Sequence, residues 1–507
     1  MIFTSFSFFI FLPAVLLVYF LIPRKWRTGW LLVASLGFYL NFYPKYILVI
    51  AFSTVVSYLA GRRLETLNGQ QESGARGGAA AAVRKRRTVL VLGIVIVTAV
   101  LVFFKYTNFL LGNVNALLGL TGIDLSVQPF SFVLPVGLSY YTFQVISYIA
   151  DVYHGKIHAE KNFLHYALYV SFFPKIISGP IERAGDFLGQ VKECHDFNLW
   201  NAKRVRDGIV LMLWGYFQKM VIADRLAILT GQVMDHFEAY GTVELFVAMC
   251  AFYIQLFADF AGYTDIALGL AKVMGFSLQD NFHAPFLAKS IREYWARWHI
   301  SLSTWLRDYI YISLGGNRKG KARKYINIMI TFLISGLWHG AGWNYAFWGV
   351  LHGAYQVVEY LIRPVVDQIN AVFHTRTESF SYGFLRTVKT WLMVALAYIF
   401  FKIPSALDGF RYIGRMLTRW NPWAMFDGTL YTLGISEKYF HLMIWFVLLL
   451  FVVEWMRYHK EVKLDVWLAG QCIWFRYGVM IALLLGIIVL GAYGPAYDAA
   501  NFLYFQF

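Results

Sequence analysis

The sequence predicts an all-α polytopic membrane protein, and composition is the first reason. Of the 507 residues, 59% are hydrophobic and only 15% are charged, whereas soluble globular proteins average about 45–50% apolar and about 25% charged residues. Aromatic residues alone contribute 19%. This composition excludes a disordered chain, a secreted scaffold held by disulfides and an ordinary cytosolic enzyme.

Apolar stretches of helical length are the second reason. A helix needs about 20 mainly apolar residues to cross a bilayer. Several stretches are shorter or carry charges, so we expect about 11–13 membrane elements, some of them re-entrant. In chain order the stretches are Phe6–Ile22, Gly29–Phe42, Tyr46–Gly61, Thr88–Tyr106, Leu134–Ile149, Phe163–Ile177, Gly208–Leu229, Val243–Leu270, Tyr325–Leu337, Trp343–Ile362, Phe384–Phe401, Phe440–Met456 and Tyr477–Tyr493.

The N-terminal region predicts the orientation in the membrane. Phe6–Ile22 is expected to be retained as the first helix, because no basic residues precede it and it has no small-x-small cleavage site. Arg24, Lys25 and Arg27 follow it, and seven more Arg and Lys residues gather in the loop Arg62–Arg87. Since positively charged loops stay on the cytoplasmic side, we expect an extracytoplasmic N-terminus.

Net charge and cysteine content narrow the expected partners. The formal net charge is +16. In a membrane protein, cytoplasmic loops explain such an excess, so we expect membrane lipid and no nucleic acid as a partner. The three cysteines, Cys194, Cys250 and Cys472, lie far apart and without a C-x-x-C spacing, which indicates neither a disulfide framework nor a metal knuckle.

The whole chain, residues 1–507, is expected to form one membrane domain with a functional middle. Residues 1–106 and 384–507 read as plain N-terminal and C-terminal helices around a core of residues 107–383. From about Ser178 to Lys324 the apolar stretches are interrupted by Pro, Gly and ionisable residues. Irregular polar backbone cannot face lipid, so this part must pack inside protein, line a water-filled cavity or lie at the interface.

Two histidines of this core are candidates for chemistry. At 3.6 residues per turn, the segment 291–312 places an aromatic stripe on one face and His299 on another. His339 ends an apolar helix, and glycines that suit the close approach of a substrate follow it, before Asn344. An ionisable group at membrane depth is costly, so each histidine is a functional hypothesis, with a buried structural role as the alternative.

Other chemical motifs are weaker. For His352 a structural role is the favoured interpretation, and a metal site of His299, His339 and His352 is not expected because no ligand spacing joins them. The sequence has no Gly-x-Ser-x-Gly elbow and no P-loop. The turn Gly315–Arg318 either binds phosphates through backbone N–H groups and the cations after it, or is an ordinary basic cytoplasmic turn.

Six blocks of sequence around these candidates resemble the membrane-bound O-acyltransferase family. The similarity is greatest to its bacterial branch, the alginate O-acetyltransferases and the membrane subunit of teichoic-acid D-alanyl transfer. It covers essentially the whole chain, and the C-terminal Asn501–Phe507 is similar to the alginate-type branch. The blocks are Ser178–Arg183, Phe257–Ile266, Asn281–Phe286, Tyr294–Tyr309, Gly315–Arg318 and Ser335–Gly340.

The resemblance implies a role for each candidate residue. It makes His339 the catalytic base and His299 its companion, at a position where animal relatives usually have Asn. A neutral imidazole takes a proton from an attacking hydroxyl, and burial favours the neutral form. Weaker candidates for binding substrate or donor are Arg307, Asp308, Asn317, Trp338, Asn344 and Arg318. The cations that suit the phosphates of coenzyme A are Arg318, Lys319, Lys321, Arg323 and Lys324.

The resemblance also implies a fold and an activity. The fold is a ring of tilted helices around a central funnel, with a tunnel that brings an acyl donor from the cytoplasm to an acceptor from outside. The activity is the transfer of an acetyl group from acetyl-CoA, a co-substrate and not a bound cofactor, for O-acetylation of an extracellular polysaccharide such as alginate. The implied location is the bacterial inner membrane, with an extracytoplasmic acetyltransferase as partner.

Two alternatives stay open from the sequence. One is D-alanyl transfer to teichoic acid from a carrier-protein thioester, although the length and the long C-terminal helical region favour the alginate-type branch. The other, from a different class, is a transporter of a polysaccharide precursor. A transporter of this kind is expected to show symmetric repeats, which the sequence lacks.

Overall fold

The computed structural model describes residues 1–72, 79–122, 127–131 and 133–493, so the C-terminal block 501–507 lies outside it. All regular structure in the described ranges is helical, which confirms the all-α class. Six described helices are long and apolar enough to cross a membrane, while the larger number of membrane elements stays a prediction. The six are α3 (Ile47–Glu72), α4 (Ala79–Leu120), α11 (Thr242–Met274), α16 (Phe380–Lys402), α18 (Glu437–Lys460) and α20 (Ile473–Leu490).

Each of the thirteen predicted stretches overlaps a helix, but two of them are interrupted. The stretch Phe163–Ile177 forms α6 (Phe163–Ser171) and α7 (Phe173–Ile176), because Pro174 lacks an N–H group and stands in the first turn of a new helix. The stretch Gly208–Leu229 contains a π-helical segment, η4 (Phe217–Ala223). Hydrophobic periodicity predicts that a helix is present, but it does not predict where the helix is interrupted or becomes π-helical.

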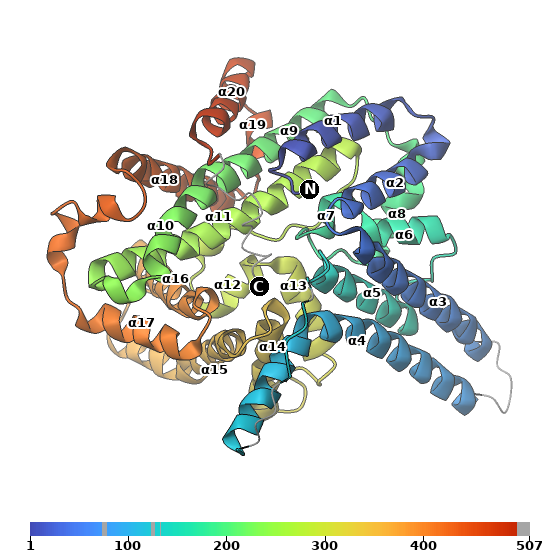
Figure 1. The fold of residues 1–507 in the computed structure, drawn as a ribbon, viewed down its shortest axis with the longest axis horizontal. Coiled ribbons are helices and arrows are strands. Elements are labelled where there is room, and N and C mark those ends of the chain that lie inside the picture. Colours follow the sequence, from blue (N-terminus) through green and yellow to red (C-terminus); the bar gives the residue numbers. More distant parts are fainter. Residues whose placement is uncertain (73–78, 123–126, 132, 494–507) are drawn as a thin grey trace. The chain divides into compact units, whose positions relative to one another are not determined.

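The described chain separates into two compact units, of which the first comprises Met1–Arg206 and Leu270–Gln279. Figure 1 shows its helices α3, α4 and α5 packed side by side, in agreement with their contacts. Besides α3, α4, α6 and α7, its elements are α1 (Phe6–Leu21), α2 (Arg27–Leu40), α5 (Leu138–Tyr153), α8 (Ala184–Glu193) and the 3₁₀ turns η1 (Arg24–Trp26), η2 (Pro44–Tyr46) and η3 (Cys194–Asp196).

The irregular segment between α7 and α8 lies inside the first unit. Its residues from Ser178 to Glu182 are buried. The ammonium group of the preceding Lys175 lies 4.4 Å from the centre of the Tyr169 ring. A carboxylate oxygen of Glu182 accepts a hydrogen bond of 2.7 Å from the backbone N–H of Gln279. Of the three options that the sequence left for this polar backbone, packing inside protein is the one observed.

The second unit comprises Asp207–Gly269 and the described residues from Asp280 on. It includes η4, α16, α18, α20 and most of α11. Its further elements are α9 (Ala202–Tyr216), α10 (Asp224–Met234), η5 (Phe237–Ala239), η6 (Pro285–Leu287), α12 (Ile291–Arg297), α13 (Ile300–Leu306), the π-helical η7 (Arg307–Tyr311), α14 (Lys321–His339), α15 (Trp343–Val372), α17 (Ala406–Thr418), η8 (Pro422–Met425), η9 (Thr429–Thr432) and α19 (Leu464–Ala469).

Glycines bring α9 and α11 together within the second unit. Gly208 and Gly215 on α9 face Gly269 and Gly262 on α11, so that a side chain at any contact would overlap the opposite backbone. Small residues at such a seam let two membrane helices approach closely. Figure 1 shows α10 and α11 side by side along the continuation of α9.

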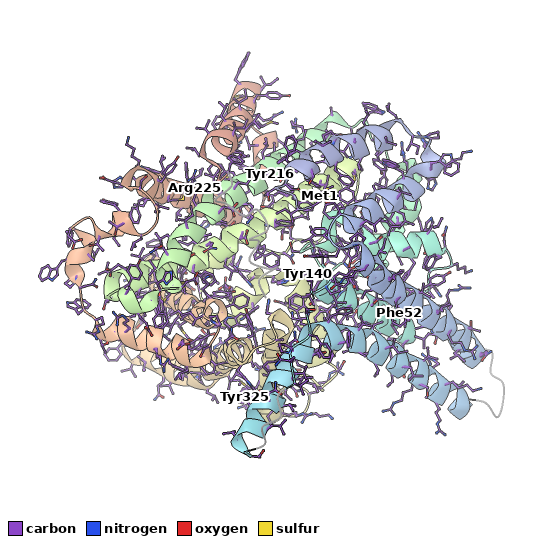
Figure 2. All side chains as sticks on the ribbon, in the orientation of Figure 1. Met1, Phe52, Tyr140, Tyr216, Arg225 and Tyr325 are labelled. Carbon is purple, nitrogen blue, oxygen red and sulfur yellow. The ribbon has the colours of Figure 1, made fainter. Side chains whose placement is uncertain are left out.

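The π-helical segment η4 carries a buried charge cluster. It lies between Tyr216 and Arg225, which Figure 2 labels on this helical run. The ammonium group of Lys219 is 2.6 Å from a carboxylate oxygen of Asp224 and 2.7 Å from one of Asp259. Buried charges persist only when they are paired in this way, so the cluster ties η4 to α10 and α11.

Candidate active site

His299 stands at a sharp break between α12 and α13. Its φ is +45°, in the left-handed region, so the single helix that periodicity indicated over residues 291–312 is wrong at this point. Asn281 holds the break. Its backbone carbonyl accepts a hydrogen bond of 2.9 Å from the N–H of Ile300, and its side-chain oxygen accepts one of 2.6 Å from the hydroxyl of Ser301.

His339 is the last residue of α14, as the sequence predicts. The chain turns away at Gly340, where the ring of Tyr345 occupies the space that a side chain would need. One turn earlier, a Cβ atom on Gly336 would lie 3.1 Å from the Cα of Gly349 on α15. These glycines allow α14 and α15 to pack closely and fix the end of α14 that carries the histidine.

The structure brings the two histidines together. Their ring centres lie 6.3 Å apart, and both side chains are buried, with His299 0% and His339 6% exposed. The indole of Trp338 packs beside both rings, with its centre 5.9 Å from the His299 ring and 5.0 Å from the His339 ring. Phe260 packs edge-on against His299 at 4.7 Å, and Trp348 packs against His339 at 5.1 Å.

Burial sets the protonation state of His299. Removal from water disfavours the imidazolium form and lowers the pKa of His299 to about 3. The ring is therefore neutral at pH 7, with one nitrogen able to donate a hydrogen bond and the other able to accept one.

His352 has a packing role in the same unit. The indole N–H of Trp295 donates a hydrogen bond of 3.3 Å to its Nδ1 atom, and its ring stacks on Tyr294 at an interplanar angle of 12°. Among the described residues, no group of three or more His, Cys, Asp or Glu side chains is arranged to hold a metal ion.

A cavity of about 590 Å³ runs toward the histidine pair from one end of α14. The first and last of its lining residues on α14, Lys324 and Ser335, are eleven positions apart, about 16 Å at 1.5 Å per residue. At the inner end are Trp295 and Ser335, both buried, together with Ile300. Ile300 follows His299 in the chain and Ser335 lies one turn before His339, so the cavity reaches neighbours of both histidines, although neither imidazole lines it.

The predicted donor-binding residues divide between the cavity and its surroundings. Arg307 and Asn317 line the cavity, and Asp308 forms an ion pair of 2.8 Å with the Arg307 side chain. Trp338 contacts the histidines. The side chain of Asn344 is buried and donates hydrogen bonds of 3.3 and 3.4 Å to backbone carbonyls at the end of α16.

The turn Gly315–Arg318 does not offer a ready phosphate cradle. The N–H groups of Gly315, Gly316 and Arg318 already donate to carbonyls of the same loop, at 2.9, 2.9 and 3.2 Å. The side-chain amide of Asn327 donates to the carbonyl of Gly316 at 2.9 Å and secures the turn to α14. These hydrogen bonds favour the alternative of an ordinary basic turn over phosphate binding through the backbone, and exposed cations remain on the loop.

Sequence reasoning missed several cavity residues. Ser335 is one helical turn before His339, and this i, i+4 spacing was the signal that could have found it. Gln356 and Tyr360 reach the cavity from α15, and the ammonium of Lys324 lies 3.4 Å from the centre of the Tyr360 ring. No sequence pattern marks these two residues, because only the packing of α14 on α15 brings them to the site.

Comparison with known proteins identifies the family of the chain. The profile of the membrane-bound O-acyltransferase family matches residues 157–401, which include both histidines. A probable alginate O-acetylase of Azotobacter vinelandii is 35% identical over 84% of this chain and 80% of its own. A peptidoglycan O-acetyltransferase of Helicobacter pylori is 30% identical over 81% and 78% of the two chains.

A teichoic acid D-alanyltransferase of Bacillus subtilis is also 30% identical, over 44% of this chain and 58% of its own. The match to acyl-transferring enzymes decides against the transporter alternative, since the enzymes match along most of the chain. The chain belongs to the membrane-bound O-acyltransferase family and is a multi-pass membrane O-acyltransferase.

Proposed function

We propose that this enzyme moves an acetyl group from acetyl-CoA at the cytoplasmic face of a bacterial inner membrane to an acceptor at the outer face. The acetyl group then serves O-acetylation of an extracellular polysaccharide such as alginate. One observation carries the proposal: two buried imidazoles lie together, and Ile300 and Ser335, which neighbour them in the chain, line a cavity whose other end is cationic.

His339 is the proposed general base. As an acceptor hydroxyl oxygen attacks the thioester carbonyl carbon, the imidazole of His339 takes the hydroxyl proton, and a tetrahedral oxyanion forms. When that intermediate collapses, the C–S bond breaks and the thiolate leaves with the proton from the imidazolium. The products are an oxygen ester and a free thiol, and the base returns to its neutral form.

His299 is the proposed companion that orients the substrate or stabilises charge. Its ring is neutral because of burial, so it offers a hydrogen bond and not a positive charge. Trp338 fixes its distance from His339, and the Asn281-bound turn fixes its direction. A hydrogen-bond donor that is held in place stabilises the transition state most where negative charge develops in it.

The cavity is the proposed path of the donor. Its volume of about 590 Å³ falls in the usual range of about 300–1,000 Å³ for ligand pockets. Arg292, Arg307 and Lys324 at its outer part suit phosphate groups, while Trp295 and Phe332 provide apolar walls for an extended thioester arm. Arg292 lies on α12, Arg307 on η7 and Lys324 near the start of α14, and the positive-inside rule makes this cationic end cytoplasmic.

The relatives favour an acetyl group over D-alanine. Similarity to proteins named alginate O-acetylase and peptidoglycan O-acetyltransferase extends over more than 80% of this chain, against 44% for the D-alanyltransferase. Under this proposal the acceptor at the outer face is the polysaccharide itself or an extracytoplasmic acetyltransferase that passes the acetyl group to it.

The test is His339→Ala in the full chain, with membrane abundance measured in parallel. We expect loss of polymer acetylation, followed by mass spectrometry, and loss of thiol release from acetyl-CoA in membranes. His459→Ala, at an exposed position near the end of α18, is the matched control and should acetylate like the wild type. Retained acetylation in His339→Ala would refute the assigned base.

A further inference from the structure

A second cavity, of about 330 Å³, lies between α12, α15 and α16. Five cationic and two acidic side chains line it. Both acids are engaged: Glu359 lies 3.7 Å from Lys389, and Asp367 lies 3.8 Å from Arg363. The other cations are Lys289, Arg292 and Arg386, and no carboxylate of the described chain pairs with them.

This cavity lies at the level of the membrane where lipid headgroups lie. Arg386 and Lys389 stand in the first turns of α16, a helix long and apolar enough to cross the membrane. The cavity is therefore at one membrane face, at the end where the cations of α14 and α15 also gather. Basic pockets between membrane helices at the cytoplasmic face are a known form of phospholipid headgroup site.

Apolar surface continues directly from the cavity. Ile362 and Val366 line it and are themselves exposed at its rim. From there an uncovered apolar stripe follows α15, and a second follows the start of α16. The exposed residues are Leu361, Val365, Ile369 and Val372 on α15, and Phe380, Phe384, Leu385 and Val388 on α16. Side chains spaced by three or four residues share one helix face, so each stripe is continuous, and both run from the cavity toward the connection between α15 and α16.

We propose that this cavity binds the headgroup of an anionic phospholipid, with the phosphate among Lys289, Arg292 and Arg386 and the start of the acyl chains at the rim of Ile362 and Val366. Charge complementarity selects an anionic headgroup over a zwitterionic one. The apolar rim, at a membrane face, favours a lipid over the nucleotide part of the acyl donor. Arg292, Gln356 and Tyr360 also line the donor cavity, so the lipid would share a wall with it.

The test is direct lipid binding to the delipidated full chain, followed by native mass spectrometry, and it does not depend on catalysis. Cardiolipin is the probe, and phosphatidylcholine is the zwitterionic comparison. We expect Lys289→Gln with Arg386→Gln to weaken cardiolipin binding about 25-fold, since each basic residue near an anionic lipid contributes about 1 kcal/mol.

The control variant removes the same charge nearby. Arg323→Gln with Arg376→Gln, two exposed cations that do not line the cavity, should bind cardiolipin like the wild type. Lys289→Arg with Arg386→Lys keeps the charge and should retain binding, which separates the effect of charge from misfolding.

Three results would overturn the proposal. If both double variants that lack two positive charges bound cardiolipin equally weakly, the loss of binding would come from general surface charge and not from this cavity. Equal affinity for phosphatidylcholine and cardiolipin would remove the basis in headgroup charge. Competition of cardiolipin by adenosine 3′,5′-bisphosphate, lost in Lys289→Gln with Arg386→Gln, would assign the cavity to the acyl donor.

Discussion

The imidazoles of His299 and His339 lie 6.3 Å apart, centre to centre, and both contact the indole of Trp338. They reach this position by different backbone geometries. A left-handed turn held by Asn281 presents His299, whereas the last residue of a regular helix presents His339. The two positions therefore respond differently to substitution.

Asparagine at position 299 should preserve partial activity. The amide of His299→Asn still donates and accepts hydrogen bonds, and Asn tolerates the left-handed backbone better than most residues. We expect a smaller loss in acetyl transfer than the roughly 10²–10⁴-fold loss expected without the general base in His339→Ala. His299→Ala, which loses the polar group and carries a left-handed strain of about 1–2 kcal/mol, should be less active and less abundant. Complete inactivity of His299→Asn at normal abundance would mean that a titrating group is needed at both positions.

Stability should fall in acid because of His299. Its pKa is about 3 in the folded protein and about 6.5 when unfolded, so below pH 6.5 the unfolded state binds more protons. The free energy of unfolding therefore holds its full value above pH 6.5 and decreases toward pH 3, by up to about 1.4 kcal/mol per pH unit. Thermal unfolding in nanodiscs between pH 7.5 and 4.5 measures the slope. It should be smaller in His299→Asn, and an identical slope in both proteins would contradict this assignment.

The contact of α14 with α15 should not accept a methyl group. In Gly349→Ala the new Cβ would overlap the carbonyl of Phe332 and lie 3.1 Å from the Cα of Gly336. Overpacking of this kind costs about 1–3 kcal/mol, so we expect a lower unfolding temperature and less enzyme in the membrane. Gly414→Ala on α17, where nothing lies within 4 Å, is the matched control and should be neutral or slightly stabilising. Equal stability of the two variants would argue against the close approach.

A large side chain at position 335 should block the donor path. Ser335 is buried at the inner end of the cavity, so Ser335→Phe fills the space before His339. We expect a fall of about tenfold or more in kcat/KM for acetyl-CoA, measured by thiol release, with little change in abundance. Ser335→Ala removes the hydroxyl and adds no volume. If it loses as much activity as Ser335→Phe, the hydroxyl and not the open space is what matters.

The fold was predictable from the sequence wherever one signal dominated. Long apolar runs such as Phe384–Phe401 and Val243–Leu270 became α16 and α11, because helix is the form that satisfies every backbone group in lipid. The breaks were not predictable. The left-handed residue at His299 depends on hydrogen bonds that Asn281 accepts from Ile300 and Ser301, and no periodicity within 291–312 encodes a partner outside that segment.

For the candidate site, the two histidines were predictable from the sequence, whereas the residues that line the cavity were not. His339 was marked by its place at a helix end among glycines, and His299 by a polar position beside an aromatic stripe. Gln356 and Tyr360 belong to the cavity only because glycines let α15 approach α14. The sequence left two interpretations of Gly315–Arg318 open, because it does not show that three of the four N–H groups donate to carbonyls of the same part of the chain.

The aromatic packing of Trp338 has a consequence for turnover. Flanked by large rings and anchored at the backbone, neither imidazole has room to swing toward a distant reactant. Thioester and alcohol must both be delivered to a stationary pair of imidazoles, and the thiol product must leave by the route through which the thioester entered. We therefore expect substrate entry and product release through the cavity, more than rearrangement of the catalytic groups, to limit the turnover rate of this enzyme.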